Sequence, residues 1–450
     1  MFLFYITLSI YWSDWTNYGI EELLMRAGTG KNAYPTIFVG TKPIERKELQ
    51  RFLDGSIKTS TNVVDSSGIW IKDRLSLALQ DFESLELESG VLQDSFTQYY
   101  ALLGKGVKSN FLTIFLDVAA KLGDSCGYPA KRWKGVIAAD YLKGYVKGSM
   151  FNFTLSIGRE PIKWGPSPRN TFVLCGDLPA FDLIRASYKT NKLKTTFFAT
   201  LLNPIGEINR YFTGHRIEYN FRHKLYLGFS EVALFGGEGR APDLYYFNPL
   251  FIYYPHQWSC KSSTNILWGL DFNLFLNGFG VYGELMIDDF PYIQSSWGEH
   301  PKIGVNMGIR GTISKNYWLI EYTTATRWTY GQVIPWQRYT YFGYPIGNPI
   351  GPDFDELFIG WVHHLNRNVD LLLETKFLRK GEGFLDEKYP SSTERFPTEY
   401  WLTGEIRKAG DFEVGIKWYK SRFVLTFKTG CIISEEKAIP KVSCFISNWK

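Results

Sequence analysis

Strict alternation of apolar and polar residues runs through most of this sequence and limits what the chain can fold into. Apolar residues occupy every second position from Ile266 to Leu276, and Asp271 and Asn273 lie between them. A period of two places the apolar side chains on one face of a β-strand and the polar side chains on the other. The same pattern recurs in several segments: 112–118, 151–157, 279–287, 400–407, 412–418 and 422–428. The sequence therefore predicts a mainly β fold.

Two architectures fit this pattern: a soluble β-sandwich with its apolar faces inside, and a transmembrane barrel with its apolar face toward lipid. The segments are about 9–11 residues long, which matches tilted membrane strands and exceeds the usual soluble strand. Aromatic residues such as Trp268, Trp318, Trp401 and Trp418 lie near segment ends, as in interfacial girdles. At roughly 20 residues per strand and connection, the pattern predicts a closed antiparallel transmembrane β-barrel of about 18 strands over residues 90–450.

The pattern before residue 90 has the period of an α-helix. Helices are predicted near 17–28, 41–55 and 69–87, and Leu75, Leu79 and Phe82 form one apolar stripe in the last of them. We therefore expect residues 1–89 to be an N-terminal segment and a small helical bundle, which the family resemblance given below would place in the periplasm. Residues 1–12 lack the basic start and the cleavage site of a complete export signal. They are therefore either the remnant of such a signal or a buried segment.

Composition excludes several function classes. Aromatic residues make up 17% and charged residues 21% of the chain, and the net charge is only +5, so neither disorder nor nucleic-acid binding is indicated. The five cysteines show no C-x-x-C spacing, so neither a disulfide framework nor a metal site is predicted. No G-x-S-x-G, H-E-x-x-H or phosphate-loop motif occurs. We expect no enzyme and no cofactor.

Six segments in order resemble the capsule-assembly Wzi-like family of outer-membrane proteins. They are GREPIKWGPSPR (158–169), LPAFDLIRASY (178–188), GHRIEYNF (214–221), LGFSEVALFGG (227–237), YYFNPLFIYY (245–254) and GELMIDDF (283–290). The resemblance covers roughly residues 90 to 450.

The resemblance implies a non-enzymatic, cell-surface protein in the outer membrane of a Gram-negative-type bacterium. It would bind capsular or other surface polysaccharide and help capsule assembly or attachment. We expect a monomer whose other partner is outer-membrane lipid. The alternatives are a substrate-selective porin, since a barrel this wide often holds a channel, and an outer-membrane enzyme built from distant strands.

The connection after residue 158 is rich in Pro and Gly and is the first candidate site. If it folds into the lumen, Arg159 would meet carboxylates, Trp164 would offer a flat face to a sugar ring, and Arg169 would belong to the same site. The competing interpretation is loop architecture, in which Trp164 packs against the wall.

Segment 326–352 is the longest loop signal and the second candidate site. Its Trp328, Trp336, Arg338 and Tyr339 lie between Gly and Pro residues, and aromatic and basic side chains together suit an acidic polysaccharide. Trp297 is a smaller candidate of the same kind. Packing of the loop over the pore is the alternative interpretation.

Three carboxylates are candidate lumen or structural residues. Glu231 follows a change in the phase of alternation, which predicts a β-bulge that turns it into the lumen, where it would form an ion pair with Arg216 or Arg159. Asp288 and Asp289 end a strand and would point to opposite faces, so a turn is favoured over a shared Ca²⁺ site.

Overall fold

The structure is a computed structural model, and the residues that it describes cover most of the barrel and small parts of the N-terminal segment. They are residues 21–25, 38, 40–42, 52, 70–71, 74, 83–92, 96–108, 112–122, 137–176, 180–222, 224–260, 263–289, 300–387, 399–420, 423–435 and 437–448.

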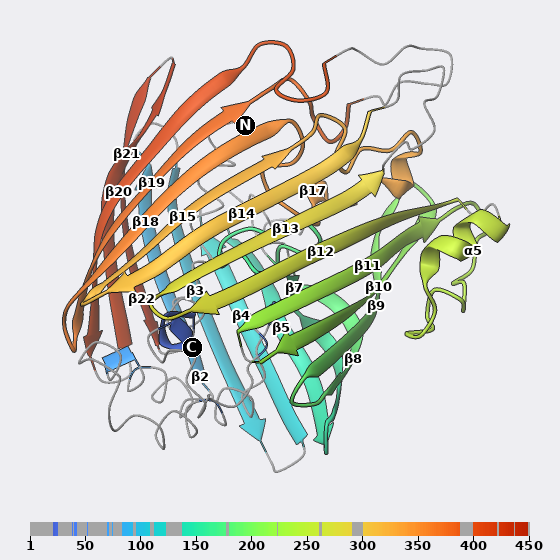
Figure 1. Cartoon of the computed structure of the whole chain (residues 1–450), viewed down its shortest axis with the longest axis horizontal. Helices are drawn as coiled ribbons and strands as arrows, with labels where there is room; N and C mark the ends of the chain where they lie inside the picture. The colour runs from blue at the N-terminus through green and yellow to red at the C-terminus, as the bar shows by residue number, and fades with distance from the viewer. Residues whose placement is uncertain are drawn as a thin grey trace.

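Eighteen of the described strands are joined edge to edge by antiparallel pairing into one closed barrel (Figure 1). Each strand pairs with the next along the chain, and β22 pairs with β2 to complete the ring. The prediction of a mainly β, antiparallel fold is confirmed. The barrel strands are β2 (Glu83–Leu92), β3 (Phe96–Lys108), β4 (Leu112–Leu122), β5 (Ile137–Met150), β6 (Phe153–Glu160), β8 (Phe181–Lys189), β9 (Leu193–Ile205), β10 (Ile208–Phe221), β11 (Leu225–Gly236), β12 (Thr264–Leu276), β13 (Phe279–Asp289), β14 (Lys302–Ile313), β15 (Asn316–Ala325), β18 (Phe354–Asn366), β19 (Val369–Lys380), β20 (Arg407–Lys420), β21 (Phe423–Ser434) and β22 (Ala438–Asn448).

Six shorter elements with described bounds are not part of this ring. They are β1 (Thr41–Lys42), β7 (Lys163–Trp164), α5 (Tyr253–Cys260), the 3₁₀-helix η1 (Pro335–Gln337), β16 (Thr340–Tyr341) and β17 (Tyr344–Pro345). No helix among the described residues combines the length and the apolar character needed to cross a membrane.

The two faces of the wall follow the alternation in the sequence. Large apolar side chains such as Ile157, Leu270 and Ile416 point outward and are about half exposed. Charged side chains such as Arg185 and Arg216 point inward and are buried, where they form ion pairs with Glu160 and Asp271. The wall thus has an apolar outer face and a polar lumen, the arrangement of a barrel surrounded by lipid.

The two ends of the barrel differ in the length of their connections. One end carries tight turns of two or three residues, such as 151–152 and 314–315, whereas the other carries the long connections 161–180, 237–263, 326–353 and 381–406. In outer-membrane barrels the short turns face the periplasm and the long loops face outside. We therefore name the two ends periplasmic and extracellular.

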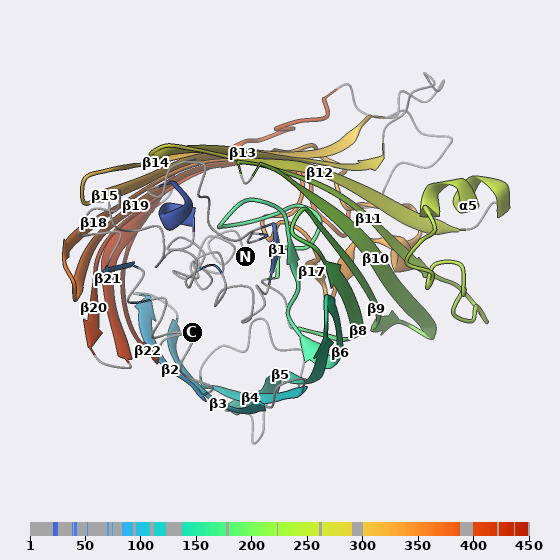
Figure 2. The ribbon, with the colours of Figure 1, turned by 60° about the horizontal axis from the view of Figure 1, so that its bottom comes forward.

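The described residues of the N-terminal segment lie inside the ring near the periplasmic end (Figure 2). Residues 21–25 are helical, and Leu23 and Met25 pack with wall residues such as Phe275. Glu21 forms an ion pair with Arg310 of β14. The segment is thus fixed to the wall by apolar packing and by charge.

The predicted helical bundle falls largely outside the described residues. Residues 52, 70–71 and 74 are helical, but the helix that we predicted to reach Leu87 is wrong at its end, because β2 already begins at Glu83. Leu85 and Leu87 fit the strand period of the barrel, so the alternation begins before residue 90.

Candidate functional site

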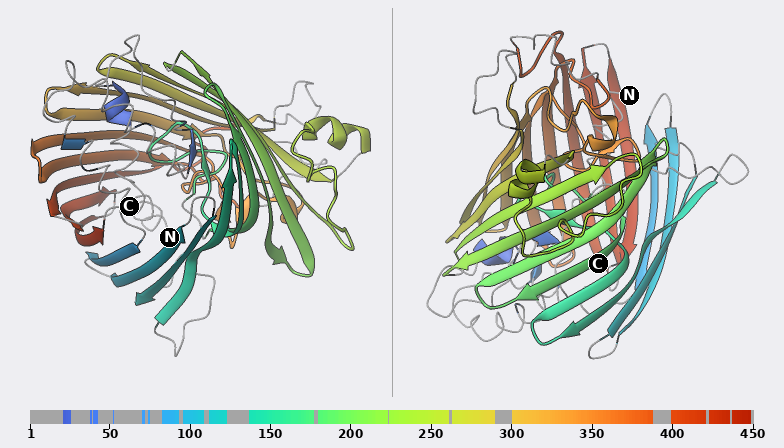
Figure 3. Two further views of the ribbon diagram at one scale, coloured as in Figure 1. Left: turned by 90° about the horizontal axis from the view of Figure 1, so that it is seen from below. Right: turned by 90° about the vertical axis from the view of Figure 1, so that its right-hand side faces the viewer.

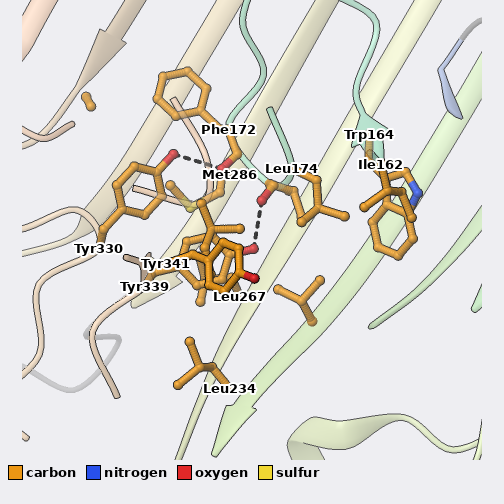
Figure 4. Close-up of a cluster of buried hydrophobic side chains, with 14 of the residues drawn as sticks. Ile162, Trp164, Phe172, Leu174, Leu234, Leu267, Met286, Tyr330, Tyr339 and Tyr341 are labelled. Carbon is orange, nitrogen blue, oxygen red and sulfur yellow. Dashed lines mark hydrogen bonds between the residues drawn. The ribbon is translucent and has the colours of Figure 1, made fainter. Parts of the chain in front are cut away.

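Two long connections meet inside the extracellular end of the barrel. We call residues 161–180, between β6 and β8, the lumen loop, and residues 326–353, between β15 and β18, the mouth loop. Figure 4 shows their apolar side chains packed together against the inner wall. Phe172 and Leu174 come from the lumen loop and Tyr330 and Tyr339 from the mouth loop.

The lumen loop folds back on itself near its start. The Trp164 backbone N–H donates to the Leu174 carbonyl oxygen at 3.0 Å, and Lys163 and Trp164 form β7, which pairs with β1 of the N-terminal segment. The Trp164 ring is fully buried and lies edge to face with Phe198 of β9, with ring centroids 5.2 Å apart. The interpretation of Trp164 as a packing residue fits this placement.

Glu284 of β13 fixes the middle of the lumen loop. Its carboxylate accepts hydrogen bonds from the backbone N–H groups of Phe172 and Val173, at 3.0 and 3.3 Å. The loop therefore reaches from β9 to β13, and a wall carboxylate satisfies backbone donors that would otherwise be buried without partners.

Arg169 fixes the lumen loop to the next strands. Its guanidinium lies 3.1 Å from Glu321 of β15 and 2.7 Å from Glu356 of β18, and it stacks 3.9 Å above the Phe358 ring. The Ser167 hydroxyl also donates to Glu321, at 2.5 Å. The loop thus enters the lumen and meets carboxylates, as the first of the two interpretations requires, although Arg169 does so in place of Arg159.

Two tyrosines of the mouth loop bind the lumen loop. The Tyr330 hydroxyl donates to the Phe172 carbonyl oxygen at 2.8 Å, and the Tyr339 hydroxyl donates to that of Val173 at 2.7 Å. Burial raises the pKa of both phenols well above the usual value. Both hydroxyls therefore remain protonated donors at physiological pH.

Glycines allow the close approach of the two loops and the wall. A Cβ on Gly304 of β14 would lie 2.3 Å from the Phe172 ring, and a Cβ on Gly347 would lie 2.0 Å from the Phe172 carbonyl oxygen. No larger residue fits either position without a shift of the loop.

Trp336 and Arg338 are held at the outer side of this packed unit. Arg210 of β10 donates from Nε to the Trp336 carbonyl oxygen at 3.0 Å and from Nη2 to that of Arg338 at 2.6 Å. Both side chains are half-buried. The Trp336 Nε1 and Arg338 Nε atoms are themselves buried and have no hydrogen-bond partner among the described residues.

The other two aromatic candidates of the mouth loop do not face solvent. Trp328 is 4% exposed and Tyr339 is fully buried, which matches the alternative that the mouth loop packs over the lumen. Trp297 lies outside the described residues. Among the tryptophans that we proposed in the mouth loop, Trp336 alone offers part of its surface.

The prediction for Arg159 is wrong, because β6 continues through this residue to Glu160. Arg159 shares the outward face with Ile157 and makes a bidentate pair with Asp182 of β8, at 2.8 and 2.7 Å. It lies on the outer wall and not in the lumen.

The predicted direction of the Glu231 side chain is also wrong. The pairing of β11 with β10 and β12 runs through Glu231 without a register shift, so there is no bulge and Glu231 points outward. It contacts His215 at 3.3 Å and accepts hydrogen bonds from the backbone N–H of Tyr253, at 2.7 Å, and from Trp268 Nε1, at 2.8 Å. Segment 237–263 covers it.

Asp288 and Asp289 end β13 and do not form a turn. The register of β13 with β14 shifts between Ile287 and Asp289, so the strict alternation that predicted opposite directions for the two side chains is interrupted at Asp288. Asp288 is buried and accepts a hydrogen bond from the Tyr330 backbone N–H at 2.9 Å, whereas Asp289 is more exposed and lies 3.6 Å from Lys302. No group of three or more His, Cys, Asp or Glu side chains among the described residues is placed to hold a metal ion.

Sequence reasoning missed Asp353, which joins the mouth loop to connection 381–406. Asp353 has a left-handed backbone with φ of 55°, and its Oδ2 accepts hydrogen bonds from Gly383 N and Thr403 Oγ1, at 2.9 and 2.7 Å. A Gly-Pro-Asp turn was visible in the sequence, but its partners come from 30 to 50 residues away.

The comparison with protein families decides the identity. Residues 136–425 match the model of the capsule assembly protein Wzi, which is more than half of the chain. The chain belongs to the Wzi capsule assembly family. As a Wzi-family β-barrel, it is a protein of the Gram-negative outer membrane. No curated protein matches it in sequence.

Solved structures support the fold of this Wzi-family chain. It superimposes on Wzi of Escherichia coli, described as an outer-membrane protein involved in group 1 capsule assembly and a carbohydrate-binding β-barrel, with a TM-score of 0.70 and 15% identity over 96% of this chain and 97% of that one. OprD and OccD3 of Pseudomonas aeruginosa are more distant: their TM-scores are 0.47 and 0.48, their identities 9% and 8%, and each match covers 81% of this chain and 93% and 90% of theirs.

Proposed function

We propose that this protein binds surface polysaccharide of the capsule at its extracellular mouth and helps to assemble or attach the capsule without catalysing a reaction. Family membership supports a role in capsule assembly. The similar Wzi of Escherichia coli is described as carbohydrate-binding, and we extend that property to this chain.

The observation that carries the proposal is the packed unit of the two loops. The lumen loop contacts wall residues from β9 to β18, and the mouth loop is bonded to it by two buried phenols. A fixed surface of this kind loses little conformational entropy when a ligand binds. Such a surface suits a protein that binds a polymer outside the cell better than a channel that transports a polymer.

Trp336 and Arg338 supply the chemistry of that surface. An indole ring covers the apolar face of a sugar, and a guanidinium binds its carboxylates or hydroxyls. Their backbones are fixed by Arg210, so both side chains start from a defined position. We propose Trp336 and Arg338 as the first ligand contacts and the buried Trp164, Arg169, Trp328 and Tyr339 as their support. Trp297 stays a proposed ligand contact.

The N-terminal segment has a separate role in this proposal. Its contacts with Arg310, His364 and Asp370 lie toward the periplasmic ends of their strands, so the segment would narrow the periplasmic mouth as a domain of its own. We further propose that the barrel acts as a monomer surrounded by outer-membrane lipid.

Trp336→Ala and Arg338→Ala test the function. A lost aromatic contact of roughly 0.5–1.5 kcal/mol corresponds to about a 2- to 10-fold weaker affinity, measured on a glycan array with the detergent-solubilised barrel. Trp401→Ala is the matched control, because Trp401 is 42% exposed but lies against Thr324 of the outer wall. In cells, retained surface glycan should fall with the same variants. Unchanged surface glycan in a full deletion would reject the proposal.

A further inference from the structure

Segment 237–263, which joins β11 to β12 and contains α5, lies outside the ring of strands (Figures 2 and 3). We call it the outer module. It packs on the outward faces of β10, β11 and β12, where Tyr246 lies 4.7 Å from Phe235 and Tyr253 lies 4.6 Å from His215, measured between ring centroids. Both tyrosines are fully buried. The module is therefore a folded part of the outer wall.

The outer module lies at a level where the neighbouring strands face lipid. On one side, Tyr211 under the module pairs with Leu201 of β9, and Leu201 is 62% exposed on the outer face. On the other side, Trp268 pairs with Ile287 of β13, which pairs with Ile303 of β14. The apolar outer face thus continues past the module on both sides.

The exposed surface of the outer module is itself apolar. Leu244 is 82% exposed, Leu250 86%, Phe251 43% and Ile252 57%. Among the charged groups of the module, Asp243 lies 3.3 Å from His256 and 3.9 Å from Arg240, whereas Glu238 is exposed. Four large apolar side chains within nine residues form a patch that water disfavours, and such patches mark an interaction surface.

We propose that the outer module is a lipid-contacting element that places Leu244, Leu250, Phe251 and Ile252 among the hydrocarbon chains of the outer leaflet. The argument is continuity: the patch lies beside an outer face that already contacts lipid. Short amphipathic elements that rest in a membrane interface use the same residue types.

The proposal also accounts for Glu231. A carboxylate on the lipid-facing side of a barrel is destabilising near the bilayer. Here the module covers the Glu231–His215 pair, and the first backbone N–H groups of α5 bind the carboxylate, at 2.7 and 3.1 Å. The same contact shields the charge from lipid and fixes the module to the wall.

Photo-crosslinking tests the proposal. A benzophenone amino acid replaces Leu250 in the full chain, which is folded into vesicles of phosphatidylethanolamine and phosphatidylglycerol, and ultraviolet light is applied. The matched control places the same group at Val333, which is 58% exposed on the mouth loop. We expect a phospholipid adduct, identified by mass, at position 250 and at least 5-fold less of it at position 333.

Two results would overturn the proposal. A dimer of this chain as the main adduct at position 250 would make the patch an interface between copies. Equal and low lipid labelling at both positions would place the module above the membrane. A second measurement places the benzophenone group at Ile252 and compares the Leu250→Asp variant with the Leu250 parent. If the module inserts into lipid, the variant should give less lipid adduct. An unchanged yield of adduct would contradict insertion. The heat-dependent mobility of the barrel on gels shows that each variant is folded.

Discussion

The Tyr330 hydroxyl donates a 2.8 Å hydrogen bond to the Phe172 carbonyl oxygen and accepts one of 2.9 Å from the Asn348 backbone N–H. One phenol thereby joins the mouth loop to the lumen loop and closes a turn within the mouth loop. Both loops are attached to the inner wall at other points, so this atom lies at the centre of the packed unit inside the extracellular end.

Tyr330→Phe removes this hydroxyl and leaves two buried backbone groups unpaired. We expect the barrel to lose about 1–3 kcal/mol of stability, seen as a lower melting temperature in detergent. Tyr188→Phe is the matched control, because Tyr188 is 45% exposed on the outer face of β8. Equal melting temperatures for the two variants would contradict the role of Tyr330.

Gly304→Ala forces the lumen loop away from the wall. A Cβ at this position would lie 2.3 Å from the Phe172 ring, so the ring and its loop must move. We expect higher ion conductance in planar bilayers and faster protease cleavage within 161–180 than in the parent protein. Gly148→Ala is the control, because a Cβ there meets no atom within 4 Å.

A second substitution separates this steric effect from a general disruption of the fold. Phe172→Ala removes the ring that the new methyl group meets, so Gly304→Ala combined with Phe172→Ala should conduct less than Gly304→Ala alone. Additive effects of the two changes would show that they act independently.

Arg169→Met isolates the electrostatic contribution of the lumen loop. Arg169 is 8% exposed between Glu321 and Glu356, and its loss removes the cation that lies between these two buried carboxylates. We expect a loss of about 3–5 kcal/mol. Arg159→Met is the control: Asp182, its partner on the outer wall, is 61% exposed, so this change does not leave a buried carboxylate behind and we expect a smaller loss of stability. Thermal unfolding of both variants in one detergent compares them.

Asp370→Asn tests how the N-terminal segment is held. Asp370 lies 2.7 Å from Arg74 and 2.9 Å from His364, and it accepts a hydrogen bond from the Tyr419 hydroxyl at 2.8 Å. A neutral amide weakens the pair with Arg74, so backbone amides near residue 74 should exchange hydrogen faster. Asp411→Asn is the control, because its partners Lys376 and Lys441 belong to the wall. Equal exchange near residue 74 in both variants would contradict this attachment.

The local period of the sequence was enough to predict which strand face meets lipid. Ile157, Leu270 and Ile416 are all outward, because alternation follows from strand geometry and needs no distant partner. The same rule could have placed Arg159 correctly, since it continues the odd-numbered series of Phe153, Leu155 and Ile157 on β6. We ended that strand too early at the Pro-Gly-rich stretch.

Glu231 shows what local pattern could not reveal. It follows Leu225, Leu227 and Phe229 in the outward series, and the apolar residues Val232 and Leu234 continue in the opposite phase, so we inferred a bulge. The segment that covers it comes from the next connection along the chain, and period alone does not show where a loop packs. The lumen-loop partners of Glu284 and Glu321 are likewise more than 100 residues away.

Glu231→Gln separates the shielding of a charge from the capping of a helix. The amide keeps one oxygen that can accept a hydrogen bond from the Tyr253 backbone N–H. It loses the negative charge beside His215 and the α5 N-terminus. The interaction of that charge with the helix N-terminus contributes about 0.3–1 kcal/mol to stability, or more in a buried site. We expect the Tyr253 and Tyr254 amides to exchange hydrogen about 2- to 10-fold faster, measured by mass spectrometry in detergent. Glu231→Ala removes the acceptor as well and should speed exchange further. Glu238→Gln, at an exposed position of the same segment, should leave it unchanged; an equal effect of Glu238→Gln and Glu231→Gln would show that Glu231 does not hold α5.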